Sequence, residues 1–185
     1  MPDRQQGTGL SEGPPRWLLI AGTAVATAAV VVVLIVAAVH RTPRSRPPVI
    51  PSMPAPQAAS PQCRALMAAL PQRLGDYQRA AAAEPVPPAT AAWQGGAGAG
   101  PVVLRCGLDR PADFVVGAPI QVVDAVQWFR VADISADLTT WFTVDRPVYI
   151  ALTLPQGSGP TPIQQLSDVI AATIPSVPIR PGPVP

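Results

Sequence analysis

A long uncharged stretch near the N-terminus constrains the fold of this chain more than any other feature. It runs from Trp17 to Val39 and reads WLLIAGTAVATAAVVVVLIVAAV. A helix of this length rises about 34 Å, which exceeds the roughly 30 Å hydrocarbon core of a bilayer. In water such a helix would have no polar face to present to solvent. The sequence therefore predicts a transmembrane helix over residues 17–39, with the membrane as its partner.

A cleaved signal peptide is the alternative for this stretch. The apolar region of a signal peptide usually spans about 7–15 residues and ends in a small-x-small cleavage site. This run is longer, and the segment AAVHRTP at its end lacks a clean site of that kind. An uncleaved anchor is favoured. Arginines flank the run in nearly equal numbers, so the charge rule does not decide its orientation.

Prolines divide the rest of the chain. Residues 41–61 hold seven of the 26 prolines, which is typical of an extended spacer. The end, PSVPIRPGPVP, reads as an unfolded tail. The predicted organisation is a cytoplasmic N-terminus (1–16), a transmembrane helix (17–39), a Pro-rich linker (40–61), an extracytoplasmic α+β domain (62–175) and a disordered tail (176–185).

The domain alternates between helical and strand patterns. A helix is expected over residues 63–82, kinked or split by Pro71, and a second helix over residues 161–174. Strand patterns occur at 102–106, on both sides of a turn at Asp124-Ala125, and in the hairpin 138–154. The predicted fold class is α+β: a transmembrane helix, a linker, and a small antiparallel sheet of four or five strands flanked by two helices.

The only two cysteines, Cys63 and Cys106, lie where the first helix and the first strand meet the surface. Packing of that helix on the sheet would bring them within bridging distance. A disulfide would close a 44-residue loop, which is worth about 4 kcal/mol by chain entropy. Two buried reduced thiols are the alternative. A disulfide fits an oxidising compartment and predicts a single-pass protein of the cytoplasmic membrane with its C-terminal domain extracytoplasmic.

The domain is poor in groups that carry chemistry. The sole histidine, His40, adjoins the apolar run, so no histidine can activate a nucleophile or join the cysteines in a metal site. We therefore predict no catalytic residue, no cofactor and no metal. From Gln62 onward eight arginines face eight aspartates and Glu84, so no basic surface for nucleic acid is expected.

Three groups of residues remain as candidates for a site. The carboxylate pairs Asp109/Asp113 and Asp133/Asp137 are more typical of solvated turns than of an active site. The aromatic residues are more typical of core packing than of a binding platform, and they are Trp93, Trp128, Phe129, Trp141 and Phe142. The arginines could hold an anion, although aspartates offer them ordinary partners, and they are Arg105, Arg110, Arg130 and Arg146.

Several segments resemble an uncharacterised actinobacterial family of small, N-terminally membrane-anchored envelope proteins that is classified only as a domain of unknown function. The matching segments are CRALMAALP (63–71), Trp93, PVVLRCG (101–107), VVDAVQWF (122–129), VYIALTLP (148–155) and LSDVIA (166–171). The resemblance implies a membrane-anchored extracytoplasmic domain with both cysteines in place, and it brings no catalytic residues.

These observations favour a non-catalytic module that binds an envelope protein or a cell-wall polymer. Two alternatives stay open. One is an envelope hydrolase or transferase that uses aspartates such as Asp109 and Asp113, and it requires two carboxylates in one cleft. The other is a carrier of a small apolar ligand, and it requires a cavity of several hundred cubic ångströms.

Overall fold

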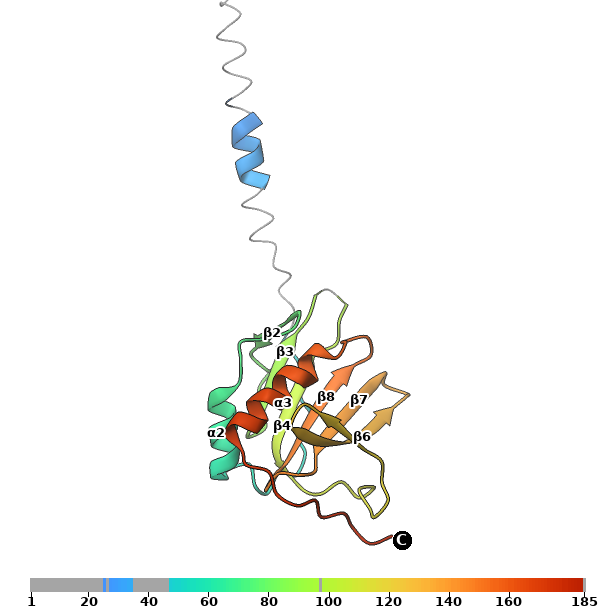
Figure 1. The fold of residues 1–185 in the computed structure, drawn as a ribbon. Helices are drawn as coiled ribbons and strands as arrows, with labels where there is room; N and C mark the ends of the chain where they lie inside the picture. Colours follow the sequence, from blue (N-terminus) through green and yellow to red (C-terminus); the bar gives the residue numbers. More distant parts are fainter. Residues whose placement is uncertain (1–24, 26, 35–46, 97, 185) are drawn as a thin grey trace, which may run out of the picture. The chain divides into compact units, whose positions relative to one another are not determined.

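The structure is a computed structural model that describes residues 25, 27–34, 47–96 and 98–184. It divides into two units, Met1–Arg44 and Ser45–Pro185. In the first unit, helix is described at residues 25 and 27–34. The second unit contains the sheet and the helices α2 and α3 (Figure 1).

The structure contradicts the predicted transmembrane helix. Among the described residues, no helix combines the length and the apolar character needed to cross a membrane. Of the predicted span, the structure describes residues 25 and 27–34, as helix. The rest of residues 17–39 lies outside the described residues. The fold class with a membrane-spanning helix is thus corrected, as is the single-pass membrane localisation derived from it.

The second unit is built on an eight-stranded sheet in the order β1-β2-β3-β4-β8-β7-β6-β5, and every neighbouring pair is antiparallel. The predicted number of strands, four or five, was therefore too low. The strands are β1 (Arg73–Leu74), β2 (Tyr77–Ala80), β3 (Thr90–Gln94), β4 (Val102–Leu108), β5 (Ile120–Val123), β6 (Val126–Asp133), β7 (Leu138–Thr143) and β8 (Tyr149–Pro155). The helices are α2 (Pro61–Ala69) and α3 (Thr161–Thr173).

The additional strands come from residues that the sequence predicts as helix or loop. Helix α2 ends at its C-cap Leu70, which is extended because the following Pro71 disfavours the helical conformation of the residue before it. Gly75, with φ +55°, then allows the turn that joins β1 to β2, since glycine has no Cβ to oppose a positive φ. Trp93, which lies outside the predicted helices and strands, is in β3 and is fully buried.

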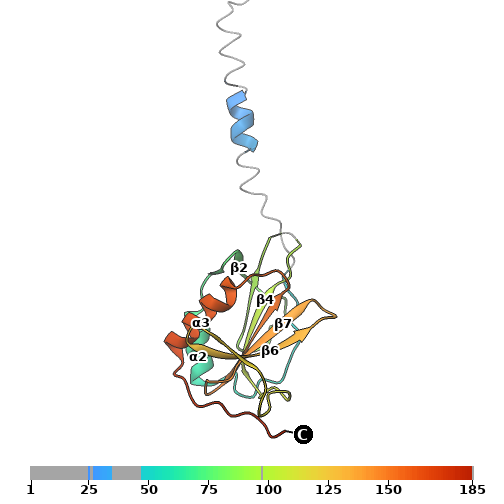
Figure 2. The ribbon, with the colours of Figure 1, turned by 45° about the vertical axis from the view of Figure 1, so that its right-hand side comes forward.

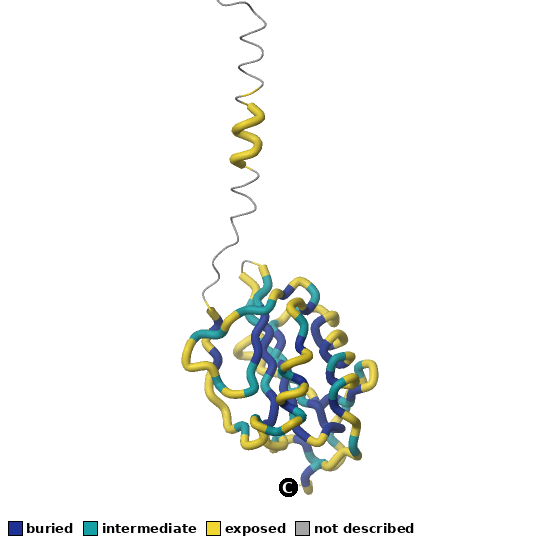
Figure 3. Tube along the Cα trace, turned by 90° about the vertical axis from the view of Figure 1, so that its left-hand side faces the viewer, coloured by how far each residue is buried: buried dark blue, intermediate teal, exposed yellow. Residues whose placement is uncertain are grey.

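Helix α3 lies across one face of the sheet, with α2 beside it (Figures 1 and 2). It contacts both edge strands, β1 and β5, so the sheet curls around it and its inner face is concave. The main core forms in this concavity. Buried strand residues such as Trp93, Trp128 and Leu152 pack there with Leu166 and Ile170 of α3. Figure 3 shows the buried residues in long stretches through the interior of the second unit.

Segments without regular structure cover part of the outer face. Ile50 packs on Ala92 of β3 and Val103 of β4. Phe114, from the loop after β4, packs on Phe129 of β6 with ring centroids 5.4 Å apart. Residues from 47 onward thus belong to the packed unit, although the linker prediction runs to residue 61.

The C-terminal segment is also part of the packed unit. Gly182 pairs in parallel with Val115, donating from its backbone N–H to Phe114 at 2.8 Å and accepting from Val116 at 3.0 Å. Val177 donates to the carbonyl of Asp145 at 2.8 Å. The expectation of a disordered tail from residue 176 fails for the residues described, because their backbone groups find partners that the local sequence does not reveal.

Candidate functional site

The two cysteines form a disulfide. Their sulfur atoms are 2.01 Å apart and their Cα atoms 5.6 Å apart, and both residues are fully buried. The bond joins the first turn of α2 to β4. Ser60 caps that turn, since its hydroxyl accepts a hydrogen bond from the Cys63 N–H at 3.2 Å. Both sulfur atoms therefore have a structural role, and the described residues include no free thiol.

The pair Asp133/Asp137 organises the turn between β6 and β7. One carboxylate oxygen of Asp133 accepts hydrogen bonds from the Ser135 hydroxyl at 2.7 Å, the Ser135 N–H at 3.1 Å and the Ala136 N–H at 3.2 Å. These bonds favour the ionised form and lower the pKa of Asp133, the Ser135 hydroxyl contributing most. Asp137 has φ +52°, and its carbonyl accepts from the Gln156 N–H at 2.9 Å. Both aspartates thus have local structural roles.

The pair Asp109/Asp113 lies exposed in the loop after β4. The backbone carbonyl of Asp113 accepts from the Val115 N–H at 3.0 Å, which shapes that loop. Neither residue lines the groove described below. Across the part of the chain that the structure describes, no group of three or more histidine, cysteine, aspartate or glutamate side chains could hold a metal ion.

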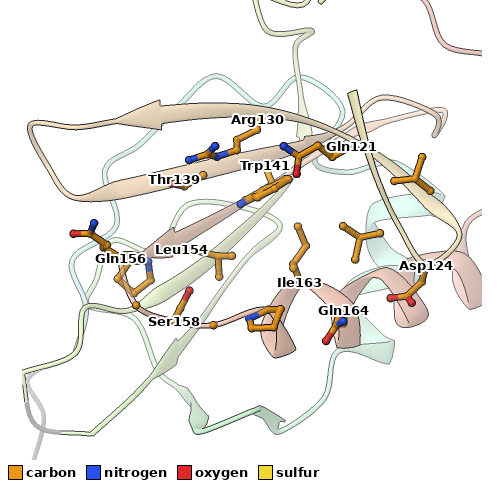
Figure 4. Close-up of a pocket in the computed structure, with 16 residues that line it drawn as sticks. Gln121, Asp124, Arg130, Thr139, Trp141, Leu154, Gln156, Ser158, Ile163 and Gln164 are labelled. Atoms are coloured by element: carbon orange, nitrogen blue, oxygen red, sulfur yellow. The ribbon is translucent and has the colours of Figure 1, made fainter. Parts of the chain in front are cut away.

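A groove of about 570 Å³ lies on the concave face of the sheet, beyond the N-terminal end of α3 (Figure 4). Strands β6, β7 and β8 form its floor, and β5, the loop between β8 and α3, and the first turn of α3 form its walls. Its lining residues are Gln121, Val122, Val123, Asp124, Arg130, Thr139, Trp141, Leu154, Pro155, Gln156, Gly157, Ser158, Gly159, Pro160, Ile163 and Gln164.

The position at which α3 begins explains why the groove is open. The loop QGSGP turns the chain back over the sheet, with Gly157 at φ +78° and Gly159 at φ +69°, values that glycine adopts at no steric cost. Thr161 then starts the helix, and Pro162 in its first turn suits the helical φ. Side chains on the inner face of β6 and β7 that lie beyond the start of α3 are not covered by a helix. Arg130 and Trp141, which are paired across these strands, are such residues.

Trp141 forms the centre of the groove floor. It is half-buried, and the guanidinium carbon of Arg130 lies 5.8 Å from the centroid of its ring, within range of a cation–π contact. Its neighbour Phe142 packs in the small cluster on the outer face. Adjacent aromatic residues therefore point to opposite faces, as the strand pattern predicts. Trp93 and Trp128 are core residues, whereas Trp141 is partly accessible.

The polar side chains around Trp141 have no hydrogen-bond partner among the described residues. They are Gln121, Asp124, Gln156, Ser158 and Gln164. Some polar side chains elsewhere are paired: the hydroxyls of Thr140 and Thr153 lie 3.0 Å apart on the outer face, and Gln165 accepts from the Gly75 N–H at 2.8 Å. The donors and acceptors of the groove are thus free to bind a ligand.

The four candidate arginines do not meet in the groove. Arg146 is buried and bonded internally, 2.9 Å from a carboxylate oxygen of Asp145 and 2.9 Å from the carbonyl of Ala125. Arg105 is half-buried in β4, and burial lowers its pKa. Of these arginines, Arg130 alone lines the groove. The groove therefore does not gather the four arginines that the sequence offered for an anion site.

Sequence reasoning singled out Trp141 and Arg130 but missed the glutamines that surround them. Gln121 lies in β5, Gln156 in the loop after β8 and Gln164 in α3. These positions are up to 43 residues apart and share no motif. Only the curled sheet brings them to one place.

Comparison with known proteins gives one match. A family model that describes a protein of unknown function matches residues 23–179. No curated protein and no solved structure matches the chain. The resemblance to an uncharacterised family is confirmed at this level.

Proposed function

The chain belongs to the DUF3515 family of proteins of unknown function, and we propose that it is a non-catalytic binding module whose ligand occupies the groove beyond α3. The observation that carries this proposal is a ring of unpaired polar side chains around a partly accessible tryptophan. The groove volume of about 570 Å³ falls within the roughly 300–1,000 Å³ typical of ligand sites. Apolar contact area with a few convergent polar groups is the usual composition of such sites.

The groups available in the groove favour binding over catalysis. Its ionisable side chains are Asp124 and Arg130, which have opposite charges. General acid–base hydrolysis by carboxylates requires two of them on either side of the scissile bond, and Asp124 has no second carboxylate beside it in the groove. No histidine occurs in residues 62–175 to activate a hydroxyl.

The alternative functions have weaker support. An aspartate-dependent hydrolase or transferase would use Asp109 and Asp113, which are exposed, or Asp133, whose carboxylate is occupied by turn hydrogen bonds. A carrier of apolar ligands would need a pocket with few polar groups, whereas this groove is rimmed by them. A protein segment or a polymer fits better than nucleic acid, since a single arginine cannot replace many counterions.

Binding to the full-length protein tests the proposal. Surface plasmon resonance would compare a panel of linear peptides with a panel of neutral and acidic oligosaccharides. We expect a ligand whose affinity falls about tenfold in Trp141→Ala. The affinity should be unchanged in Gln78→Ala, an exposed glutamine of β2 outside the groove. Affinity that is insensitive to Trp141→Ala would contradict the proposed site.

The same samples test the absence of catalysis. Each bound ligand would be incubated with the protein and examined by mass spectrometry. We expect its mass to remain unchanged. A cleaved or transferred product that disappears with Asp124→Asn would show that the groove is an active site instead.

A further inference from the structure

We infer that the ligand of the groove is a neutral, linear oligosaccharide, an inference that rests on the proposed function and specifies its ligand class. Three properties of the groove support it: its elongated form, the combination of an apolar floor with uncharged polar walls, and its balanced charge.

The groove is elongated. Figure 4 shows Gln156 at one end, Asp124 and Gln164 at the other, and Trp141 between them. These residues come from the loop after β8, the β5–β6 turn, the first turns of α3 and the strand β7. A groove with polar groups at both ends and an aromatic ring between them suits an extended chain that contacts all three regions.

The floor offers apolar surface suited to sugar rings. Trp141 is half-buried, and the largely buried side chains of Leu154 in β8 and Ile163 in α3 line the groove beside it. A pyranose ring has faces rich in C–H groups that pack against aromatic and aliphatic side chains, while its hydroxyls point outward around the rim. An amphipathic aromatic floor is suited to a ligand with one apolar and one polar aspect.

The walls offer groups that match hydroxyls. Each of Gln121, Gln156 and Gln164 carries both a carbonyl acceptor and an amide donor, and Ser158 and Thr139 add hydroxyls that can do both. Sugar hydroxyls likewise donate and accept, so neighbouring hydroxyls can pair with the two ends of one carboxamide. A peptide added along the edge strand β5 would instead be recognised mainly through its backbone.

The charge of the groove favours a neutral chain. Arg130 and Asp124 offset each other, and the Arg130 guanidinium is held against Trp141 at 5.8 Å from the ring centroid. A polyanionic chain would require several cations along its path. The hydrogen-bonding groups that remain are uncharged.

The inference is tested by isothermal titration calorimetry of the full-length protein with a neutral β-linked glucan hexasaccharide and a hexasaccharide of N-acetylglucosamine. An acidic oligosaccharide and an extended peptide panel are measured in parallel. We expect at least one neutral hexasaccharide to bind and the acidic one to bind at least tenfold more weakly. Trp141→Ala should abolish or weaken binding about tenfold, and Trp141→Phe should retain most of it.

Substitution of a glutamine of the groove tests binding without altering a residue that packs in the core. Gln164 is exposed, so Gln164→Ala should leave the fold intact. It should lower the affinity roughly 2- to 12-fold through lost hydrogen bonds. Gln78→Ala is the matched control and should leave the affinity unchanged. Circular dichroism melting of each variant verifies that it is folded.

The outcomes separate this inference from the proposed function. If peptides bind in a Trp141-dependent manner and neither neutral hexasaccharide does, the ligand class is wrong and the binding function stands. If the acidic oligosaccharide binds more tightly than the neutral hexasaccharides, the inference of a neutral ligand is likewise wrong and the binding function stands. If none of the probes binds, or Gln164→Ala and Trp141→Ala leave binding unchanged, both the inference and the groove as a binding site are contradicted.

Discussion

Gly107 occupies a position where the Cβ atom of any other residue would clash with backbone atoms. The register between β4 and β8 shifts between Cys106 and Leu108, and Gly107 lies in this bulge with φ +87°. Its carbonyl accepts a hydrogen bond from the Gln57 N–H at 3.0 Å. A Cβ atom here would lie 2.3 Å from the backbone nitrogen of Ala58 and 2.3 Å from the carbonyl carbon of Gln57. Backbone atoms cannot rotate away as a flexible side chain can.

The substitution Gly107→Ala should therefore lower the free energy of unfolding by about 2–4 kcal/mol, from left-handed strain plus the clash. Gly117→Ala is the matched control, because Gly117 has φ +88° and no neighbouring atom within 4 Å of an added Cβ. Gly117→Ala should lower the free energy of unfolding only through the left-handed strain, by about 1–2 kcal/mol. Urea unfolding of both variants measures the difference, and equal losses would show that the approach of residues 57–58 is unimportant.

At the scale of elements, the disulfide is the covalent link between α2 and β4. Residues 64–105, which it encloses, contain β1, β2, β3 and the glycine-rich segment before β4. Two of these strands are short, and β1 is an edge strand. The link therefore limits how far this half of the sheet can separate in the unfolded state.

The double variant Cys63→Ala/Cys106→Ala should lose about 4 kcal/mol of stability, as expected for a closed loop of this length. Thermal unfolding of the reduced wild-type protein is the matched control, because it breaks the link without removing the buried sulfur atoms. Both should lower the melting temperature to a similar extent. A loss below about 1 kcal/mol in both, well under the range for a native disulfide, would mean that packing alone holds α2 against β4.

The hairpins were the elements that local sequence predicted well. Alternation of apolar and polar residues on both sides of a short turn predicted the hairpin of β7 and β8. The Asp124-Ala125 turn joins β5 to β6 as expected. Residues 71–82 were predicted as the second part of a helix kinked or split by Pro71, because Leu74 and Tyr77 continue the helical spacing of the apolar residues before them. Tertiary contacts decide otherwise: Leu74 and Tyr77 are buried in the core, and Arg79 lies 4.8 Å from the ring centroid of Trp93 on the neighbouring strand.

At the scale of the whole second unit, the C-terminal segment holds together parts of the chain that are far apart in sequence. Val177 bonds to the turn between β7 and β8, and Gly182 bonds to the loop after β4. That loop carries Phe114 onto the outer face of the sheet. Stability of the outer face should therefore depend on residues at the very end of the chain.

Removal of residues 176–185 should lower the free energy of unfolding by roughly 2–4 kcal/mol. The truncation breaks the three backbone hydrogen bonds of Val177 and Gly182, and each such bond contributes about 1 kcal/mol. Hydrogen exchange should also become faster at Val116. Truncation after Gly182 is the control, since it leaves these bonds in place, and it should have little effect. If the longer truncation is equally harmless, the segment is not part of the cooperative unit.

The sequence by itself determined the features that depend on near neighbours or on a unique pair. Alternating strands, the proline that ends α2 and the two cysteines available for one disulfide are of this kind. It also predicted a transmembrane helix over residues 17–39, which is contradicted within the part of the chain that the structure describes.

Only the tertiary structure decided the candidate site. Gln121, Trp141 and Gln164 belong to three elements, and no local pattern relates them. They converge because the sheet curls until both edge strands contact α3, and because α3 begins short of the end of the concave face. Sheet curvature and helix position result from packing of the whole core, and so they lie beyond what spacing along the chain can specify.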